Sequence, residues 1–153
     1  MPVIVAKRPL PLPPTPLLYV VAVNNTNRSK MGVATVLALL RPRDKIICLH
    51  IIQPTQGELG DQGKSEVDEI NQYYSEELRL FAPQDSKMVQ VPLVDGKSTA
   101  QTVVEFVNDT CDPAPDFLCI SPRSRVNDNE ETSSLSAGVI GGAKCNVLFL
   151  KNK

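Results

Sequence analysis

The chain has 153 residues, of which 42% are hydrophobic and 22% charged, as in an ordinary globular domain with a sizeable core. Sixteen basic residues face seventeen acidic ones, and the formal net charge of -1 argues against nucleic acid as the main partner, because phosphate binding needs a basic excess. No run approaches the roughly 18 apolar residues of a membrane span. The N-terminus also lacks the charge-then-apolar order of a signal peptide, so we expect a cytoplasmic protein.

Residues 1–16 form a proline-rich segment, with prolines at positions 2, 9, 11, 13, 14 and 16. Each proline fixes φ and lacks an amide donor, so neither a helix nor a central strand is expected here. We predict an extended polyproline-II tail that is mobile and dispensable for folding. Residues 3–5 read Val-Ile-Val and could add a short edge strand, but the prediction does not rely on them.

The same segment contains a short recognition pattern. Arg8, Pro11 and Pro14 fit R-x-x-P-x-x-P, which SH3 domains bind. A preformed polyproline-II helix loses little entropy on docking, and the arginine sets its orientation. Such short patterns often arise by chance in proline-rich segments, so a plain spacer is the alternative interpretation.

From residue 17 onward, apolar strands alternate with helices. Continuous apolar runs are typical of strands buried on both faces, as in parallel sheets; with one alternating strand added, the five strands are residues 17–23, 45–52, 87–94, 117–120 and 145–150. Helical composition or spacing marks residues 30–40, residues 67–81, a segment capped by Ser98 or Thr99, and a short helix before residue 145. This order predicts one doubly wound, three-layer α/β/α domain over residues 17–151 with a parallel sheet.

Five local sequences resemble the universal stress protein family. Residues 21–29 read VAVNNTNRS, similar to the family's V-A-V-D-G-S-x-x-S, and residues 50–52 resemble its L-H-V. Residues 94–104 resemble V-x-x-G-x-P-A-x-x-I, residues 116–121 resemble D-L-I-V-M-G, and residues 143–148 resemble A-x-C-P-V-L. The pieces occur in the family's order. The resemblance implies a five-stranded parallel sheet in the order 3-2-1-4-5, usually in a dimer.

ATP-binding members of that family carry G-x-x-G-x9-G-[S/T] after strand four. Glycines let backbone amides approach phosphates closely, and the following helix N-terminus adds a favourable dipole. The resemblance implies that the adenosine side is held by the turn after strand one, at Asn24, and by the backbone after strand two, at Ile51. Asn24 stands where the family usually has aspartate.

This chain departs from the glycine pattern at every position. Ser121 and Ser124 replace the first two glycines, and the third position falls on Ser133 or Ser134 because the loop is about one residue short. Pro122 removes one loop amide. Carboxylates at positions 128, 130 and 131 repel phosphate by about 1 kcal/mol each at 4 Å, even in water. We therefore predict that ATP binding is weak or lost.

Some features of the loop oppose this prediction. Serine hydroxyls can donate to a phosphate or cap the next helix, a role open to Ser133, Ser134 and Ser136. Arg123, with Arg125, could offset the carboxylates. ATP or AMP is therefore kept as an alternative ligand, although no cofactor is expected.

Other candidate chemistry finds little support. His50 is the only histidine and no G-x-S-x-G elbow is present, so a hydrolase triad is not indicated and His50 is interpreted as a satisfied strand-end residue. The carboxylates of residues 66–77 are typical of a solvated helix face. The four cysteines lack C-x-x-C spacing, which argues against metal; we interpret three as core residues and Cys111 as the most exposed thiol.

The last strand is predicted to join a homodimer. In the order 3-2-1-4-5 it lies at an edge, where unpaired amides and carbonyls invite another strand. Antiparallel pairing of two copies would close a two-fold contact through Val147, Leu148, Phe149 and Leu150. The alternative is that Lys151 and Lys153 protect this edge.

These features are compatible with two functional classes. The first is a non-enzymatic, dimeric regulatory or scaffolding domain with weak or lost ATP binding. The second is a stress-response switch that binds ATP or AMP through the serine-substituted loop. The proline-rich segment as an SH3 ligand is a further alternative.

Overall fold

The computed structural model describes residues 3–12, 15–54, 65–82, 85–121 and 137–150. Within them the strands are β1 (Val3–Val5), β2 (Leu18–Ala22), β3 (Lys45–Ile52), β4 (Lys87–Pro92), β5 (Phe117–Ile120) and β6 (Asn146–Phe149). The helices are α1 (Asn27–Leu39), α2 (Glu66–Phe81), α3 (Thr99–Glu105) with its π-helical continuation η1 (Phe106–Thr110), and a short turn of helix over residues 137–142. None of the helices described is long and apolar enough to cross a membrane.

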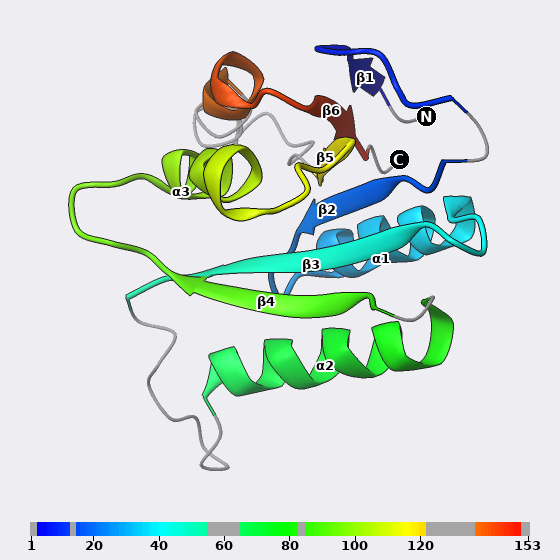
Figure 1. Cartoon of the computed structure of the whole chain (residues 1–153). Helices are drawn as coiled ribbons and strands as arrows, with labels where there is room; N and C mark the ends of the chain where they lie inside the picture. The colour runs from blue at the N-terminus through cyan, green and yellow to red at the C-terminus, as the bar shows by residue number, and fades with distance from the viewer. Residues whose placement is uncertain (1–2, 13–14, 55–64, 83–84, 122–136, 151–153) are drawn as a thin grey trace.

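The strands form one six-stranded mixed sheet in the order β1-β6-β5-β2-β3-β4 (Figure 1). Five of them run parallel, in the order β4-β3-β2-β5-β6, and β1 pairs antiparallel with β6. The expectation of a purely parallel, five-stranded sheet is corrected by β1. Its Val-Ile-Val sequence suits an edge strand, and it satisfies backbone groups that β6 would otherwise expose.

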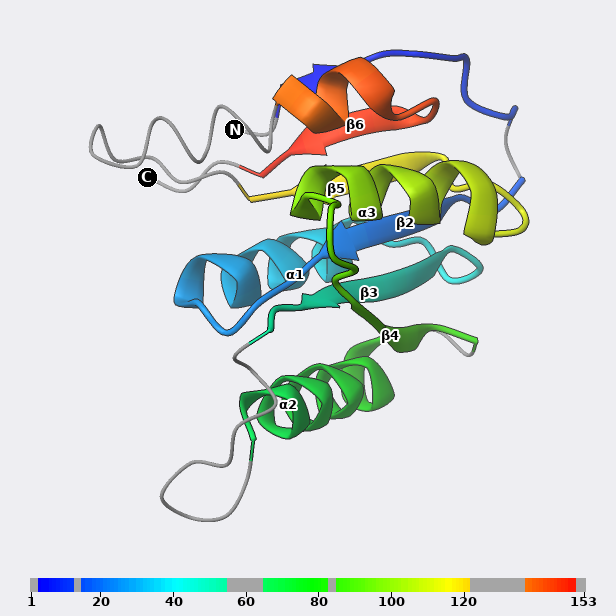
Figure 2. The ribbon, with the colours of Figure 1, turned by 90° about the vertical axis from the view of Figure 1, so that its left-hand side faces the viewer.

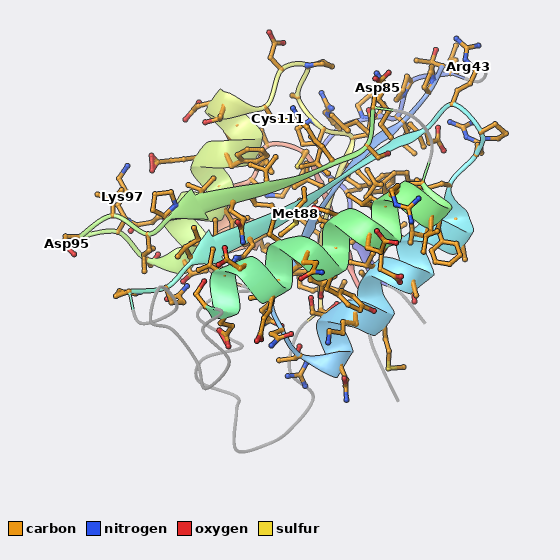
Figure 3. All side chains as sticks on the ribbon, turned by 90° about the horizontal axis from the view of Figure 1, so that it is seen from below. Arg43, Asp85, Met88, Asp95, Lys97 and Cys111 are labelled. Atoms are coloured by element: carbon orange, nitrogen blue, oxygen red, sulfur yellow. The ribbon has the colours of Figure 1, made fainter. Side chains whose placement is uncertain are left out.

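Two apolar layers flank the sheet. Helices α1 and α2 cover one face, as Figure 3 shows, while α3 and residues 137–142 lie over the other (Figure 2). Along β2, Tyr19 and Val21 face the α1 and α2 layer and Val20 faces the opposite layer, all of them buried. Burial on both faces is why the central strands read as continuous apolar runs rather than as alternating ones.

Side-chain caps set where the helices begin. Thr26 accepts a hydrogen bond from the amide of Ser29 and starts α1 three residues before the predicted position. Ser65 caps α2, and Ser98 forms a reciprocal capping box with Gln101 at the start of α3. These bonds satisfy amides that have no partner within the helix. Of the two predicted caps for α3, Ser98 is therefore the one used.

Acceptor side chains anchor the amino ends of the strands. Asp44 Oδ1 accepts from the amide of Leu17 at 2.8 Å, and Asp116 Oδ2 accepts from Leu18 at 2.8 Å. Asp44 is 1% exposed and also accepts from the backbone and guanidinium of Arg41. Burial pushes its pKa up, but the hydrogen bonds from Arg41 and Leu17 outweigh burial and hold the pKa below its ordinary value.

The N-terminal segment is docked rather than detached. Its three-residue strand β1 pairs with β6, and Asn146 Oδ1 accepts from the amides of Lys7 at 2.7 Å and Arg8 at 3.0 Å. Residues 3–8, which belong to the segment predicted to be a mobile tail, are therefore docked on the sheet in this structure. Proline spacing reveals the lack of helix, but it cannot reveal that the Val-Ile-Val before the prolines finds an open sheet edge.

Arg8 is engaged within the chain. Its guanidinium donates to the carbonyl of Pro115 at 2.6 Å and lies 3.6 Å from Asp116 Oδ1. The SH3 interpretation needs this arginine free to meet an acidic partner, so docking would first have to break both contacts. Pro11 is part-buried, and Pro14 lies outside the described residues.

The predicted dimer contact rests on a wrong premise, because β6 is not the edge of the sheet. β1 occupies that position, and the four residues assigned to the interface are at most 8% exposed: Val147, Leu148, Phe149 and Leu150. They are core residues of the single chain.

Candidate functional site

A cleft of about 420 Å³ opens where β2, β3 and β5 end. After β2 the sheet continues through β3 on one side and β5 on the other, so the connections leave in opposite directions. In open α/β sheets this is where ligands bind, because the diverging loops leave a crevice between them. Its polar lining includes Asn24, Thr26, Ser29, Gln53, Thr99 and Ser121.

The turn after β2 is held by its own side chains. Asn24 Oδ1 accepts from the amide of Thr26 at 2.9 Å and from its hydroxyl at 2.6 Å. The amide of Asn24 donates in turn to Ser29 Oγ at 2.9 Å. Asparagine in place of the family's aspartate thus supports an Asx-type turn without adding charge to the cleft.

Tyr74 of α2 holds this turn through a hydrogen bond from its hydroxyl. Its ring is fully buried, and its hydroxyl donates to the carbonyl of Asn24 at 2.8 Å. The same oxygen lies 2.8 Å from Ser29 Oγ, which completes a closed set of hydrogen bonds in which Ser29 donates to Tyr74 and accepts from Asn24. Burial raises the pKa of Tyr74 well above its ordinary value, so the phenol stays a neutral donor.

The wall after β3 is tied to the start of α3. The side-chain amide of Gln53 donates to Thr99 Oγ1 at 3.2 Å and lies 3.4 Å from the carbonyl of Ile51. Ile51, named from the sequence for its backbone, therefore lies on the cleft as expected. Its carbonyl is shared with a side chain that the sequence pattern did not single out.

His50 also borders the cleft and is 1% exposed. Its Nδ1 lies 3.1 Å from the side-chain amide of Gln90 on the neighbouring strand, and that amide also donates to the carbonyl of Val67. An amide donor at Nδ1 leaves the proton on Nε2 in the neutral ring. At Nδ1, the partner of this lone histidine is the side chain of Gln90.

Ser121 ends β5 and faces α1. Its Oγ is buried and has no hydrogen-bond partner among the residues described. It packs against Gly32, where an added Cβ would lie 2.4 Å from this oxygen. With Ser121 in this rotamer, only glycine at position 32 leaves room for the hydroxyl.

Charged side chains are scarce on the described part of the cleft wall. Glu66, at the start of α2, is its one formally charged side chain, and the described part of the lining contains no lysine or arginine. An adenosine-sized neutral group meets donors and acceptors here, whereas a phosphate meets no cation on this part of the wall.

The structure brings some of the site residues predicted from the sequence together around the cleft. Asn24, Ile51 and Ser121 all line the cleft. The remaining predicted residues, which are Arg123, Ser124, Ser133, Ser134 and Ser136, lie outside the described residues. Sequence reasoning missed three residues of the site. Tyr74 lies on the apolar face of a helix, Gln53 belongs to no motif, and Thr99 was considered only as a helix cap.

Metal and thiol chemistry gain no support from the described residues. They contain no cluster of three or more His, Cys, Asp or Glu side chains able to hold a metal ion. Cys48, Cys119 and Cys145 are buried and Cys111 is half-buried. Burial raises the pKa of the Cys48 thiol to about 12, so it stays protonated and unreactive.

Comparison with known proteins shows the fold. No protein-family profile matches the chain, and no curated protein sequence matches it. Among solved structures, the universal stress protein UspA from Lactobacillus plantarum has a TM-score of 0.65 at 9% identity, covering 89% of this chain and 99% of that one. A universal stress protein in complex with cAMP has a TM-score of 0.64 at 15% identity, covering 88% and 96%.

A third structure is the universal stress protein from Archaeoglobus fulgidus in complex with dAMP, with a TM-score of 0.58 at 19% identity and coverage of 87% and 96%. Identities this low support a shared fold and not a shared ligand. The resemblance found in the sequence is confirmed at that level: the chain has a universal-stress-protein-like fold along most of its length.

Proposed function

We propose that this chain is a non-enzymatic, cytoplasmic regulatory or scaffolding domain of the universal stress protein type, with weak or lost ATP binding. The observation that carries the proposal is the cleft itself. It lies at the position where α/β folds take ligands, but its described wall offers Glu66 and no cation to a triphosphate. Ser121 adds a side chain where close backbone approach needs glycine.

The absence of an enzymatic role is supported by the polar groups of the cleft. Tyr74, Ser29 and Asn24 hydrogen-bond to one another, and the His50 ring is buried against Gln90. A general base needs a titratable group within reach of a substrate proton. These hydrogen bonds engage the four side chains in supporting the turn and the strand.

The alternative is a switch that binds ATP or AMP. One observation favours it: Ser121 Oγ, at the edge of the cleft, has no hydrogen-bond partner among the described residues. A ligand oxygen could satisfy this hydroxyl after a change of rotamer. Two proteins of similar fold are described as complexes with cAMP and dAMP, which supports adenine nucleotides as the ligand class to test.

Calorimetry with ATP, AMP and adenosine separates the two candidates. We expect an ATP dissociation constant weaker than about 1 µM, that is, less favourable than about -8 kcal/mol. ATP and adenosine should differ by less than about tenfold, since the described wall offers the phosphates no charge-assisted hydrogen bond. Micromolar or tighter ATP binding that adenosine does not reproduce would establish the switch instead.

Serine variants locate any binding that is found. Ser121→Ala and Ser134→Ala should each weaken it if the predicted loop holds the phosphates. Ser86→Ala is the matched control, because Ser86 lies at the opposite end of the sheet, where its hydroxyl accepts from the amide of Ile46. Equal affinities in all three variants would place the nucleotide elsewhere.

A further inference from the structure

The carbonyl of Ile51 lies where β3 extends past the end of β2. The last backbone hydrogen bond between the two strands runs from the amide of Val23 to the carbonyl of Leu49 at 2.8 Å. Carbonyls alternate in direction along a strand, so the carbonyl of Ile51, two residues further on, also points toward β2. The paired register ends at Ala22, so the described ladder supplies this carbonyl with no amide.

The side chain of Gln53 takes the place of the missing amide. Its Nε2 lies 3.4 Å from the carbonyl oxygen of Ile51 and donates to Thr99 Oγ1 at 3.2 Å. A carboxamide nitrogen carries two N–H groups, so one can serve the end of β3 and the other the first residue of α3. All three residues line the cleft. The amide of Gln53 therefore connects two walls of the cleft.

The contact between Gln53 and Ile51 is long. Hydrogen bonds from N–H to oxygen are usually about 2.7–3.2 Å long, so a ligand donor at ordinary distance would make a better bond to the same carbonyl. The donor that suits this position is the exocyclic amine of a neutral base. An anionic group is disfavoured, because the described part of the lining contains no lysine or arginine.

We propose that Gln53 is a specificity-determining residue of the cleft, because its amide covers the carbonyl that would otherwise recognise the amine of an aminopurine. With Gln53 present, the cleft discriminates little between a purine that carries a 6-amino group and one that lacks it. Without this amide, the cleft selects the amine-bearing base. The inference rests on the proposed function, since it concerns the same cleft and gives weak nucleotide binding a second cause.

The test compares the unsubstituted chain with Gln53→Ala in NMR titrations. The ligands are adenosine and purine riboside, which lacks only the 6-amino group. Gln53→Ala should bind adenosine at least about threefold more tightly than the unsubstituted chain, since one net hydrogen bond contributes roughly that factor. Its affinity for purine riboside should change less than about twofold. The matched control is Gln72→Ala, which removes an exposed glutamine of α2 and should change neither affinity.

Gln53→Met separates loss of the donor from loss of volume. Methionine is a long, unbranched side chain like glutamine, but it has no N–H group. The ratio of adenosine affinity to purine riboside affinity should therefore rise in this variant as it does in Gln53→Ala. An equal gain for both ligands in Gln53→Ala, with no gain in Gln53→Met, would show that Gln53 only fills space and would overturn the proposal.

The proposal also fails if adenosine affinity is unchanged in both variants, or if Gln53→Ala binds no adenosine. The proposed function is contradicted by a different measurement, namely ATP binding by the unsubstituted chain with a dissociation constant of about 1 µM or less. Gln53 is part-buried and belongs to neither apolar layer, so both variants should keep the fold. The two failures are thus distinguishable.

Discussion

At the end of the sheet where the strands begin, side chains satisfy the backbone; at the end where they finish, a cleft remains. Asp44, Asp116 and Asn146 each accept amides at the first end, and Asp44 is almost completely buried while doing so. At the other end the turn after β2 is fully hydrogen-bonded, yet Ser121 Oγ has no partner among the described residues. The comparison separates groups that stabilise the fold from groups that are available to a ligand.

The largest effect on stability is expected at the end of the sheet where the strands begin, which we call the closed end. Asp44→Asn should lower the free energy of unfolding by about 2–3 kcal/mol near pH 7, because hydrogen bonds to a charged acceptor contribute about that much. The measurement is denaturant unfolding. Nucleotide affinity should not change, since Asp44 lies at the opposite end of the sheet from the cleft.

The effect of Asp44 should also depend on pH. Its folded-state pKa is depressed, so its contribution is complete above the unfolded-state pKa of about 3.9 and is lost as the pH falls through the lower folded-state value. The stability difference between the unsubstituted chain and Asp44→Asn should therefore shrink below about pH 4. Asp85→Asn is the control, because Asp85 is 77% exposed and should change little. A pH-independent difference would contradict the assignment.

A smaller effect on stability is expected from the turn after β2, which lies at the open end of the sheet, where the strands finish and the cleft remains. Tyr74→Phe removes the hydroxyl that joins Asn24 and Ser29 and should cost about 1–2 kcal/mol of stability. Amide exchange at Asn24 and Thr26 should accelerate, because the turn loses its support. Tyr73→Phe removes a hydroxyl from the adjacent, part-buried ring and should leave that exchange unchanged. Equal exchange in both variants would show that the turn does not need Tyr74.

The smallest expected effect comes from removing one serine hydroxyl, and the resulting change in stability should differ in sign between the two ends of the sheet. Ser121→Ala removes a buried hydroxyl that lacks a partner among the described residues, so it should leave stability unchanged or raise it by up to about 1 kcal/mol. Ser86→Ala, the same substitution at the closed end, leaves the amide of Ile46 without its acceptor and should cost about 1 kcal/mol. Thermal unfolding of the two variants measures both. Losses of equal size would mean that Ser121 is as well satisfied as Ser86.

Much of the fold could be predicted from local pattern. Strands buried on both faces need apolar residues at every position, and such runs predicted β2, β3, β5 and β6. The two candidate caps, Ser98 and Thr99, predicted where α3 begins, and Ser98 is the one used. In the cleft, Asn24, Ile51 and Ser121 were found through the resemblance to the universal stress protein motifs, and all three line the cleft at the carboxyl ends of β2, β3 and β5.

The sequence by itself determined the alternation of strands and helices, because hydrophobic period and capping are local properties. Only the tertiary structure decided which distant groups meet: Tyr74 beneath the turn at Asn24, Gln90 against His50, and β1 on the edge of β6. A tyrosine on an apolar helix face predicts burial, but the partner of its hydroxyl depends on how α2 crosses the sheet. Likewise, Val-Ile-Val predicts a strand only where an edge remains open, and that edge exists only once the other five strands have been ordered.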